Sequence, residues 1–357
     1  MKKTVLFDRH EKLNAKIVDF AGYLMPVSYS SVNEEHLHVR NEVGVFDVSH
    51  MGEIEISGLN SLNFIQHLCS NDISKIMIGK AQYNCLVNEQ GGIIDDLIVY
   101  RIELEKFLLV VNASNIIKDL EWINKQNKKF NCSVDDLSNE ISLLAIQGPK
   151  AEDLCQKFTS ENLSLLPNYS FTISTFAGFK NIIISKTGYT GSGGYELYIP
   201  NKSVINIWDT LFSSKDFNLK PIGLAARDTL RIEMGYCLYG NDINDNISTL
   251  EANLRWITKV ETNFIGSEVI RSQIKLGCKK KLVGFKLIEI SIPRNGYEIY
   301  SFDKKIIGNV TSGTFSPILK KGVGLGYIKT ANLKDDLIYI KIRNNLIEAK
   351  IVETPFI

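Results

Sequence analysis

Residues 281–352 hold six short runs rich in β-branched and aromatic residues: KLVGFKLI (281–288), GYEIYSF (296–302), KKIIGNVTSG (304–313), GVGLGYI (322–328), LIYIKI (337–342) and LIEAKIV (346–352). Turn-forming residues separate these runs, which is the pattern of short strands joined by tight connections. Asn344-Asn345 is predicted to form the tip of the last hairpin. The sequence therefore predicts a small antiparallel β-barrel at this end of the chain.

Upstream of these runs, helical and strand patterns alternate without a regular order. The patterns predict a strand and turn in ISLLAIQGPK (141–150), strand, glycine-rich loop and strand in NIIISKTGYTGSGGYELYIP (181–200), and helices through Trp208 and Leu211, over about Leu224–Met234 and over LEANLRWI (250–257). Irregular mixing followed by an all-β module indicates an α+β fold rather than a doubly wound parallel sheet.

The N-terminal part contains a well-marked helix over residues 31–44. Ser31 and Glu34 have the spacing of a capping box, and Gly44 suits a helix end. His36 falls on the apolar face of this helix, so we interpret it as a half-buried structural residue rather than a metal ligand. A strand around residues 53–56, a helix over about 60–69, a strand over 107–111 and a helix over 115–124 are also predicted.

Two strand runs, AQYNCLV (81–87) and IIDDLIVYRI (93–102), flank residues 88–91 and predict a hairpin. Alternation puts Asp96 on one face with Tyr100, and pairing of Val87 with Gly92 would place Tyr83 opposite Asp96. Aspartate is disfavoured in strands, so Asp96 beside two tyrosines on an apolar face indicates function. Asp95, on the other face, is interpreted as a structural residue near the strand end, with Arg101 as its candidate partner.

The stretch TGYTGSGGYEL (187–197) contains four glycines in a short loop, which lets the backbone approach a neighbour closely. Glu196 in the following strand could accept two N–H donors from a planar heterocycle, such as the 2-amino-4-oxo edge of a pterin. The residue pattern alone favours a flexible surface loop with an outward-pointing glutamate. A dinucleotide-binding loop is excluded because no helix follows the glycines.

In GLAARDTLR (223–231), Arg227 and Arg231 share one helix face with apolar neighbours. This face could point into a cleft. The two arginines could equally be tied to nearby acids such as Asp228, Glu233 or Asp242, and the residues alone leave both interpretations open.

The composition limits the classes of function. The chain has 357 residues, 44% of them hydrophobic, and a formal net charge of +1. This suits two or three packed units, and we expect neither a nucleic-acid partner nor a membrane span. The first residues, MKKTVLFDRH, lack the apolar core of a signal peptide, so we expect a cytoplasmic protein.

Cysteine and histidine usage points away from metal and disulfide chemistry. The six cysteines include no CxxC pair, which predicts reduced and mostly buried thiols. All five histidines lie within residues 10–67, which excludes a His-rich metal site or a downstream catalytic histidine. Acid–base chemistry would therefore rely on carboxylates, tyrosines or the substrate itself.

Several long motifs in this order resemble the T protein family of the glycine cleavage system. They are DFAGYLMPVSYSS, VRNEVGVFDVSHMGE, QYNCLVNEQGGIIDDLIVY, AIQGPKA, TGYTGSGGYEL, GLAARDTLRIE, YGNDI and TSGTFSP, and they run through most of the chain. The resemblance implies a three-domain, ring-like fold with folate in a central channel and a C-terminal antiparallel β-barrel. The expected domains are residues 1–52 with about 140–245, residues 53–139, and a linker helix and barrel over about 246–357.

The resemblance also implies an activity. An aminomethyltransferase would move the methylene of an aminomethyl group on lipoylated H protein to the co-substrate tetrahydrofolate. Ammonia would be released, and 5,10-methylenetetrahydrofolate and dihydrolipoyl H protein would form. The family uses no metal and no flavin.

The family's site residues carry over by motif. Asp96 matches the catalytic aspartate, which hydrogen-bonds folate N10 and orients the nucleophile. Glu196 matches the pterin-binding glutamate, and Arg227 matches an arginine lining the folate site. The remaining expected folate-binding residues, which line the channel, are Tyr83, Tyr100, Tyr189, Tyr236 and Met51. Many family members continue past a Pro-Phe pair with an aromatic residue and a basic tail, whereas this sequence stops at Ile357.

Three alternatives are less well supported. Folate-binding proteins of iron–sulfur cluster maintenance carry K-G-C-Y-x-G-Q-E where residues 234–242 read MGYCLYGND, with the cysteine displaced and the Gln-Glu pair absent. A folate domain from a dimethylglycine- or sarcosine-oxidising enzyme would accompany a flavin domain, for which no strand–GxGxxG–helix unit is present. A scaffold or binding module would have no reason to place Asp96 in a β run.

Overall fold

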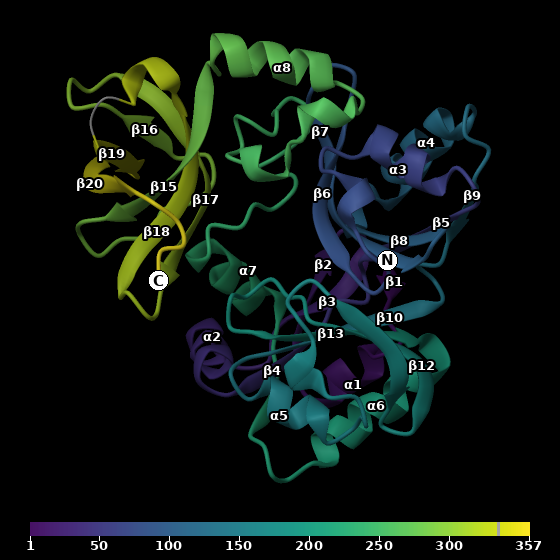
Figure 1. Ribbon diagram of the computed structural model, residues 1–357. Helices are drawn as coiled ribbons and strands as arrows, with labels where there is room; N and C mark the ends of the chain where they lie inside the picture. The colour runs from purple at the N-terminus through teal and green to yellow at the C-terminus, as the bar shows by residue number, and fades with distance from the viewer. Residues whose placement is uncertain (334–335) are drawn as a thin grey trace. The chain divides into compact units, whose positions relative to one another are not determined.

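The computed structural model describes residues 1–333 and 336–357 (Figure 1). The chain divides into two compact units, each described here by itself. Unit 1 comprises Met1–Phe64, Ile73–Tyr83 and Leu97–Asp228, and unit 2 comprises Ile65–Asp72, Asn84–Asp96 and Thr229–Ile357. The three-domain division expected from the sequence remains a prediction.

The main element of unit 1 is a six-stranded sheet of order β11-β12-β13-β10-β4-β14. Its strands are β4 (Val43–Asp47), β10 (Ile141–Gln147), β11 (Phe171–Phe176), β12 (Phe179–Ser185), β13 (Gly194–Pro200) and β14 (Leu219–Pro221). Only the short β14 pairs in parallel, with β4. Helices α5 (Ala151–Gln156) and α6 (Asn201–Ser213) pack on this sheet.

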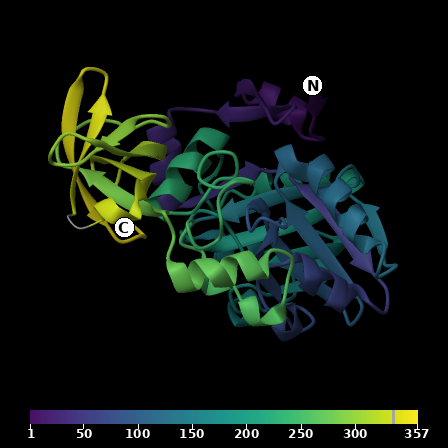
Figure 2. The ribbon, with the colours of Figure 1, turned by 90° about the horizontal axis from the view of Figure 1, so that it is seen from above.

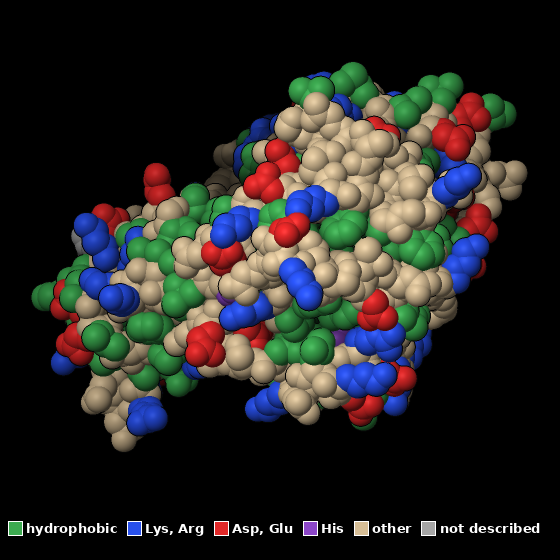
Figure 3. All heavy atoms as spheres, turned by 90° about the horizontal axis from the view of Figure 1, so that it is seen from below, with side chains coloured by type: hydrophobic (Ala, Val, Ile, Leu, Met, Phe, Trp, Pro, Cys, Tyr) green, Lys and Arg blue, Asp and Glu red, His purple; other side chains and the backbone are tan. Residues whose placement is uncertain are grey.

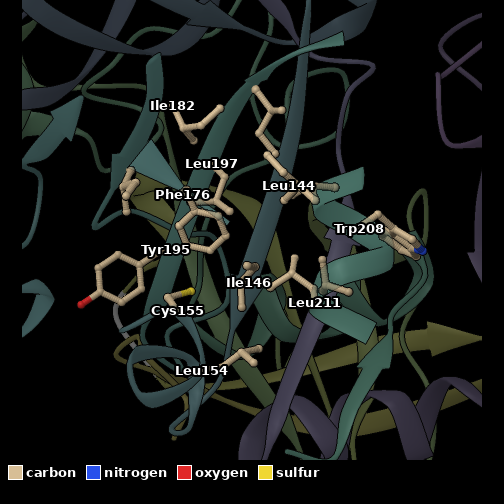
Figure 4. Packing of buried hydrophobic residues seen from close by; sticks show 14 of the residues in the cluster. Leu144, Ile146, Leu154, Cys155, Phe176, Ile182, Tyr195, Leu197, Trp208 and Leu211 are labelled. Atoms are coloured by element: carbon tan, nitrogen blue, oxygen red, sulfur yellow. The ribbon is translucent and has the colours of Figure 1, made fainter. Parts of the chain in front are cut away.

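Alternation along the central strands separates two faces of this sheet. Leu144 on β10 lies opposite Leu197 on β13, and both side chains join the buried apolar cluster under α5 and α6 (Figure 4). Trp208 and Leu211 of α6 close that cluster, as their helical spacing predicts. Glu196 and Tyr198 of β13 therefore point to the opposite face of the sheet.

A second sheet has the order β6-β7-β8-β5-β9. Its strands are β5 (Gly52–Ser57), β6 (Ala81–Val87), β7 (Ile93–Glu103), β8 (Lys106–Val111) and β9 (Ser133–Asp136), accompanied by helices α3 (Ser61–Leu68) and α4 (Ile116–Asn127). Val110 on β8 lies opposite both Ile98 on β7 and Glu53 on β5. Directly paired residues share a face, so Glu53 points to the same side as Ile98 and Tyr100.

The N-terminal elements of unit 1 form a small three-stranded sheet of order β1-β3-β2 and two helices. They are β1 (Lys2–Lys3), α1 (Phe7–Lys12), β2 (Lys16–Phe20), β3 (Tyr23–Ser28) and α2 (Val32–Asn41). The predicted capping box is confirmed, because Ser31 accepts from the Glu34 amide and Glu34 accepts from the Ser31 amide. The predicted helix end at Gly44 is wrong, since α2 stops at Asn41 and Val43 already begins β4.

The predicted C-terminal barrel is confirmed within unit 2. Six strands close in the order β15-β18-β17-β16-β19-β20, and all of their pairings are antiparallel (Figure 2). Their bounds are β15 (Lys280–Leu287), β16 (Glu298–Tyr300), β17 (Ile306–Ser316), β18 (Lys321–Lys329), β19 (Leu337–Ile342) and β20 (Asn345–Val352). The last hairpin turns one residue earlier than predicted, because Ile342 pairs with Asn345 and Arg343 takes a left-handed φ of 56°.

The helix predicted over LEANLRWI is wrong. Only the 3-10 turn Arg255–Ile257 forms there. Ser248 and Glu251 exchange hydrogen bonds as in a capping box, but Asn253 adopts a left-handed φ of 62°, which stops helical propagation. The Glu251 carbonyl instead accepts a hydrogen bond from the Leu282 amide of β15, so this segment is shaped by long-range contacts.

The remaining helices are α7 (Leu224–Glu233) and α8 (Ser267–Leu276), with 3-10 turns at Ile73–Lys75, Ala113–Asn115, Leu163–Leu165, Val260–Thr262 and Thr330–Asn332. Among the described residues, no helix has the length and apolar character needed to cross a membrane. Five of the six cysteines are buried and Cys278 is half-buried, as predicted. Lysine and arginine are interspersed with aspartate and glutamate on the face in Figure 3, in keeping with the near-neutral charge.

Candidate functional site

Hydrogen bonds and close packing hold the glycine-rich loop between β12 and β13. Gln147 at the end of β10 donates to the Thr187 carbonyl at 3.2 Å and accepts from the Thr190 hydroxyl at 2.8 Å. The Arg40 guanidinium of α2 donates to the Thr190 carbonyl at 2.5 Å. A Cβ added at Gly188 would lie 2.1 Å from the Gln147 amide oxygen, so this glycine is needed for close packing. These contacts from β10 and α2 fix the path of the loop beside β13.

A chain of hydroxyl groups crosses the layer between the two sheets of unit 1. The Tyr198 hydroxyl donates to the Tyr100 hydroxyl at 2.9 Å. Tyr100 in turn lies 3.1 Å from the Ser185 hydroxyl and 3.2 Å from the Thr187 hydroxyl. Thr187 donates to Glu196 Oε2 at 2.5 Å. Burial raises the pKa of Tyr100 well above its usual range, so this phenol stays a protonated donor.

Glu196 lies at the end of this series of hydroxyl groups. It is a buried carboxyl group, and the described residues donate a hydrogen bond to only one of its two oxygens. Its side chain is 8% exposed, which corrects the interpretation of an outward-pointing strand residue. Thr187 is its hydrogen-bond donor at Oε2, and Oε1 receives no donor from the residues the structure describes. A carboxylate has room for several hydrogen bonds. The free oxygen of Glu196 can therefore accept donors from a ligand.

Arg227 supplies the opposite charge within the same unit. Its guanidinium lies 4.8 Å from the centre of the Tyr189 ring, in the loop described above. Nη1 is buried and has no hydrogen-bond acceptor among the described residues. Burial lowers the pKa of Arg227, while Glu196 and Tyr189 oppose that shift. Glu196 thus acts on Arg227 electrostatically, although the two form no direct ion pair.

His50 lies within the electrostatic reach of this cation. Burial lowers the pKa of His50 to about 4, Asp47 opposes that shift, and Arg227 adds to it. The imidazole of His50 is therefore neutral at neutral pH. It packs edge-on against Phe20, with 5.3 Å between the ring centroids. Sequence reasoning used His50 only to argue against a metal site and assigned it no other role.

The other predicted site residues are distributed between the two units. Unit 1 brings together Tyr100, Tyr189, Glu196 and Arg227, whose contacts are given above, and it also contains the half-buried Tyr83 and Met51. Asp96, which is half-buried on β7, and Tyr236, which is 38% exposed, belong to unit 2. Tyr100 differs from the expectation of a channel-lining residue, because it is fully buried and its hydroxyl is engaged by neighbouring side chains.

Two alternatives left open by the sequence are now resolved. Arg231 is tied to an acid, because its Nη1 donates to Asp242 at 2.7 Å with both side chains removed from solvent. Asp95 is fully buried rather than solvated at a strand end. Its candidate partner Arg101 donates to the carbonyl oxygens of Ile76 and Leu104 instead.

Sequence reasoning missed three buried polar residues of unit 1. Tyr198 shares the strand face of Glu196, and this alternation could have identified it. Thr187 was visible in the glycine-rich motif but carried no separate signal. Glu53 was predicted only as part of a strand around residues 53–56. It is fully buried, and neither carboxyl oxygen has a hydrogen-bond partner among the described residues. Burial, reinforced by Asp136, raises the pKa of Glu53 well above its usual range.

Comparison with known proteins accounts for the whole chain. A family model described as the GCVT N-terminal domain matches residues 6–262, and one described as the glycine cleavage T-protein C-terminal barrel domain matches residues 280–357. The chain is 53% identical to an aminomethyltransferase of Flavobacterium psychrophilum, covering 100% of this chain and 99% of that protein. It is 44% identical to an aminomethyltransferase of Thermosipho melanesiensis, with coverage of 100% and 97%.

A solved structure gives the same result at the level of the fold. The crystal structure of glycine cleavage system aminomethyltransferase T from Bartonella henselae matches with a TM-score of 0.93 and 32% identity, over 100% of this chain and 98% of that one. The chain therefore belongs to the glycine cleavage T-protein family, the aminomethyltransferases of the glycine cleavage system.

Proposed function

We propose that the chain transfers the methylene of an aminomethyl group, carried on the lipoyl arm of an H protein, to tetrahydrofolate. The carbon–sulfur bond to the lipoyl arm breaks, the nitrogen leaves as ammonia, and a dihydrolipoyl arm remains. The observation that carries the proposal is a buried carboxyl group, Glu196, and a half-buried arginine, Arg227, whose Nη1 is buried; the two share unit 1 without pairing directly.

The unsatisfied atoms of these two residues fit a pterin. Leaving a buried polar atom such as Arg227 Nη1 unpaired costs about 1–3 kcal/mol, so this atom favours a ligand that supplies an acceptor. Glu196 Oε1 is an acceptor, and the 2-amino-4-oxo edge of a pterin offers adjacent N–H donors. Arg227 Nη1 is a donor for a carbonyl or carboxylate oxygen of the same ligand. Tetrahydrofolate supplies, when bound, the two nitrogens N5 and N10 that receive the carbon.

Asp96 is the residue to which we assign the chemistry. Its assignment rests on the match between residues 82–100 and the family motif, and on a half-buried carboxylate within a strand rich in isoleucine, leucine and valine. A carboxylate beside N10 would orient the amine and support the positive charge that develops on the transferred carbon. The proposal also assigns folate contacts to Tyr83, Tyr189, Tyr236 and Met51. Tyr100 would act on Glu196 indirectly, through its hydroxyl contact with Thr187.

A single-turnover assay tests this function. Protein is mixed with aminomethyl-lipoyl H protein, with and without tetrahydrofolate, and 5,10-methylenetetrahydrofolate and ammonia are measured together. We expect both products to form in equal amounts and only when tetrahydrofolate is present. Tight folate binding without turnover would contradict the transferase assignment and favour a folate-binding maintenance protein.

A further inference from the structure

Tyr198 lies two residues beyond Glu196 on β13, on the same face of the strand. Its side chain is 3% exposed. Its hydroxyl donates to Tyr100 at 2.9 Å, and the two rings meet edge to face at 5.3 Å between centroids. A buried phenol needs a hydrogen-bond partner, and Tyr198 finds it on β7 of the other sheet in unit 1. This phenol is therefore joined to Glu196 by side chains from several elements.

The hydrogens of this chain can be assigned from simple valence. A carboxylate can only accept hydrogen bonds, so Thr187 must donate its single hydroxyl hydrogen to Glu196 Oε2. Thr187 then accepts from its other neighbours, and Tyr100 lies 3.2 Å from it. Tyr100 has its own hydrogen available because it accepts from Tyr198. Tyr100 can donate to Thr187 directly, or to Ser185 at 3.1 Å, whose hydroxyl lies 2.9 Å from Thr187 and can donate to it. By either route the donors run from Tyr198 through Tyr100 to Thr187 and Glu196.

Hydrogen bonds that run in one direction polarise one another and strengthen the last bond. The last bond here holds Oε2 of Glu196. Fixing that oxygen also fixes the direction of the free oxygen Oε1, because the carboxylate is planar. We propose that Tyr198 is a positioning residue, which aims Glu196 at the amino edge of the bound pterin without touching the ligand itself.

This inference rests on the proposed function, in which Glu196 binds folate. It goes further by assigning specificity for the pterin 2-amino group to a residue outside the binding surface. The chain of hydroxyls uses three other side chains, Tyr100, Thr187 and Ser185, and all of them lie within unit 1.

The same strand provides a matched control. Tyr195 is also a fully buried tyrosine, but it points to the opposite face of β13. Its hydroxyl donates to Glu152 at 2.8 Å and to the Leu163 carbonyl at 3.0 Å, so it takes no part in the chain that ends at Glu196. Tyr195→Phe and Tyr198→Phe thus each remove one buried hydroxyl from one strand.

The test compares affinities for tetrahydrofolate and for its analogue lacking the 2-amino group, measured by calorimetry for unmodified protein and both variants. Unmodified protein should prefer tetrahydrofolate. Tyr198→Phe should reduce that preference by up to about tenfold, because it removes a neutral hydrogen bond to Tyr100 that strengthens the bond from Thr187 to Glu196. Tyr195→Phe should leave the preference unchanged even if its melting temperature falls by a similar amount.

The outcomes separate the two claims. If Tyr198→Phe and Tyr195→Phe prefer tetrahydrofolate over the analogue to the same extent, Tyr198 does not position Glu196. The proposed function would be unaffected by that result. Absence of tetrahydrofolate binding by unmodified protein would overturn the proposed function and this inference with it. If Tyr198→Phe does not fold, Thr187→Val breaks the same chain at nearly constant volume, and the same loss of preference is expected from it.

Discussion

Arg231 donates to Asp242 at 2.7 Å inside unit 2, and the carboxylate also accepts from the Ser312 hydroxyl at 2.8 Å and the Leu238 amide at 2.9 Å. Arg227, one helical turn earlier on α7, has a buried nitrogen with no acceptor among the described residues. The two arginines therefore have different roles. Arg231 stabilises the structure, whereas Arg227 is available to a ligand.

Asp242→Asn should destabilise unit 2 strongly. The substitution removes the buried carboxylate that pairs with Arg231 at 2.7 Å, and breaking one side of a buried pair costs about 3–5 kcal/mol. Urea-induced unfolding measures this cost. Asp209→Asn is the control, since it removes the acid of the exposed pair with Arg9 and should change stability little. Similar effects of the two substitutions would contradict the structural role assigned to Asp242.

Glu53→Gln should change how stability depends on pH. The pKa of Glu53 is raised in the folded chain, so its carboxyl stays protonated there while the unfolded chain ionises it. The contribution of Glu53 to the free energy of unfolding should therefore be fully present below about pH 4.5 and be lost as pH rises towards the folded pKa. The neutral amide removes that slope, and the variant should gain stability relative to unmodified protein at pH 8.

The control for Glu53→Gln is Glu55→Gln on the same strand. Glu55 is partly exposed and pairs with Lys106 at 2.9 Å. We expect this variant to keep the pH slope of the unmodified protein. A flat pH profile in unmodified protein, measured by thermal unfolding between pH 4.5 and 8, would show that Glu53 does not carry this effect.

Arg227→Met should affect stability and binding in opposite directions. Methionine replaces a half-buried cation, whose buried Nη1 has no acceptor among the described residues, with an apolar side chain of similar length, so the melting temperature should stay constant or rise. Tetrahydrofolate affinity should fall at least tenfold, because a hydrogen bond to a charged group is worth about 1.5–3 kcal/mol. Calorimetry and thermal unfolding on one preparation test both points. A large drop in melting temperature would mean that Arg227 is structural, like Arg231.

Asp96→Asn should separate binding from chemistry. Asparagine keeps the size and hydrogen-bonding shape of Asp96 but cannot support a developing positive charge. We expect folding and tetrahydrofolate affinity to be largely preserved, while single-turnover formation of methylenetetrahydrofolate slows by two or more orders of magnitude, a typical loss for an electrostatic catalytic group. Full activity in this variant would remove Asp96 from the catalytic role.

Local patterns predicted the regular elements well. The reciprocal bonds of Ser31 and Glu34, the glycine-rich loop before β13 and the six barrel strands were all visible because each depends on neighbouring residues. The LEANLRWI segment failed for the opposite reason. Its local signal is helical, but the left-handed Asn253 and the Glu251–Leu282 backbone contact override that signal.

The site was only partly predictable for a similar reason. The family motif identified Glu196 and Arg227, yet residue pattern alone favoured an exposed Glu196. Its burial depends on Tyr100, which lies 96 positions earlier, and on the packing of two sheets. Such contacts carry no periodic signal in one sequence. The same limit explains why Glu53, within a regular strand alternation, was not recognised as a buried acid.

The central claim is that the free oxygen of Glu196 binds the amino edge of tetrahydrofolate. The most direct measurement is the calorimetric affinity of Glu196→Gln for tetrahydrofolate and for the analogue lacking the 2-amino group. We predict that the variant binds tetrahydrofolate at least tenfold more weakly and no longer distinguishes the two ligands, because the amide offers a donor where the pterin presents one. Unchanged affinity and unchanged discrimination would contradict the account.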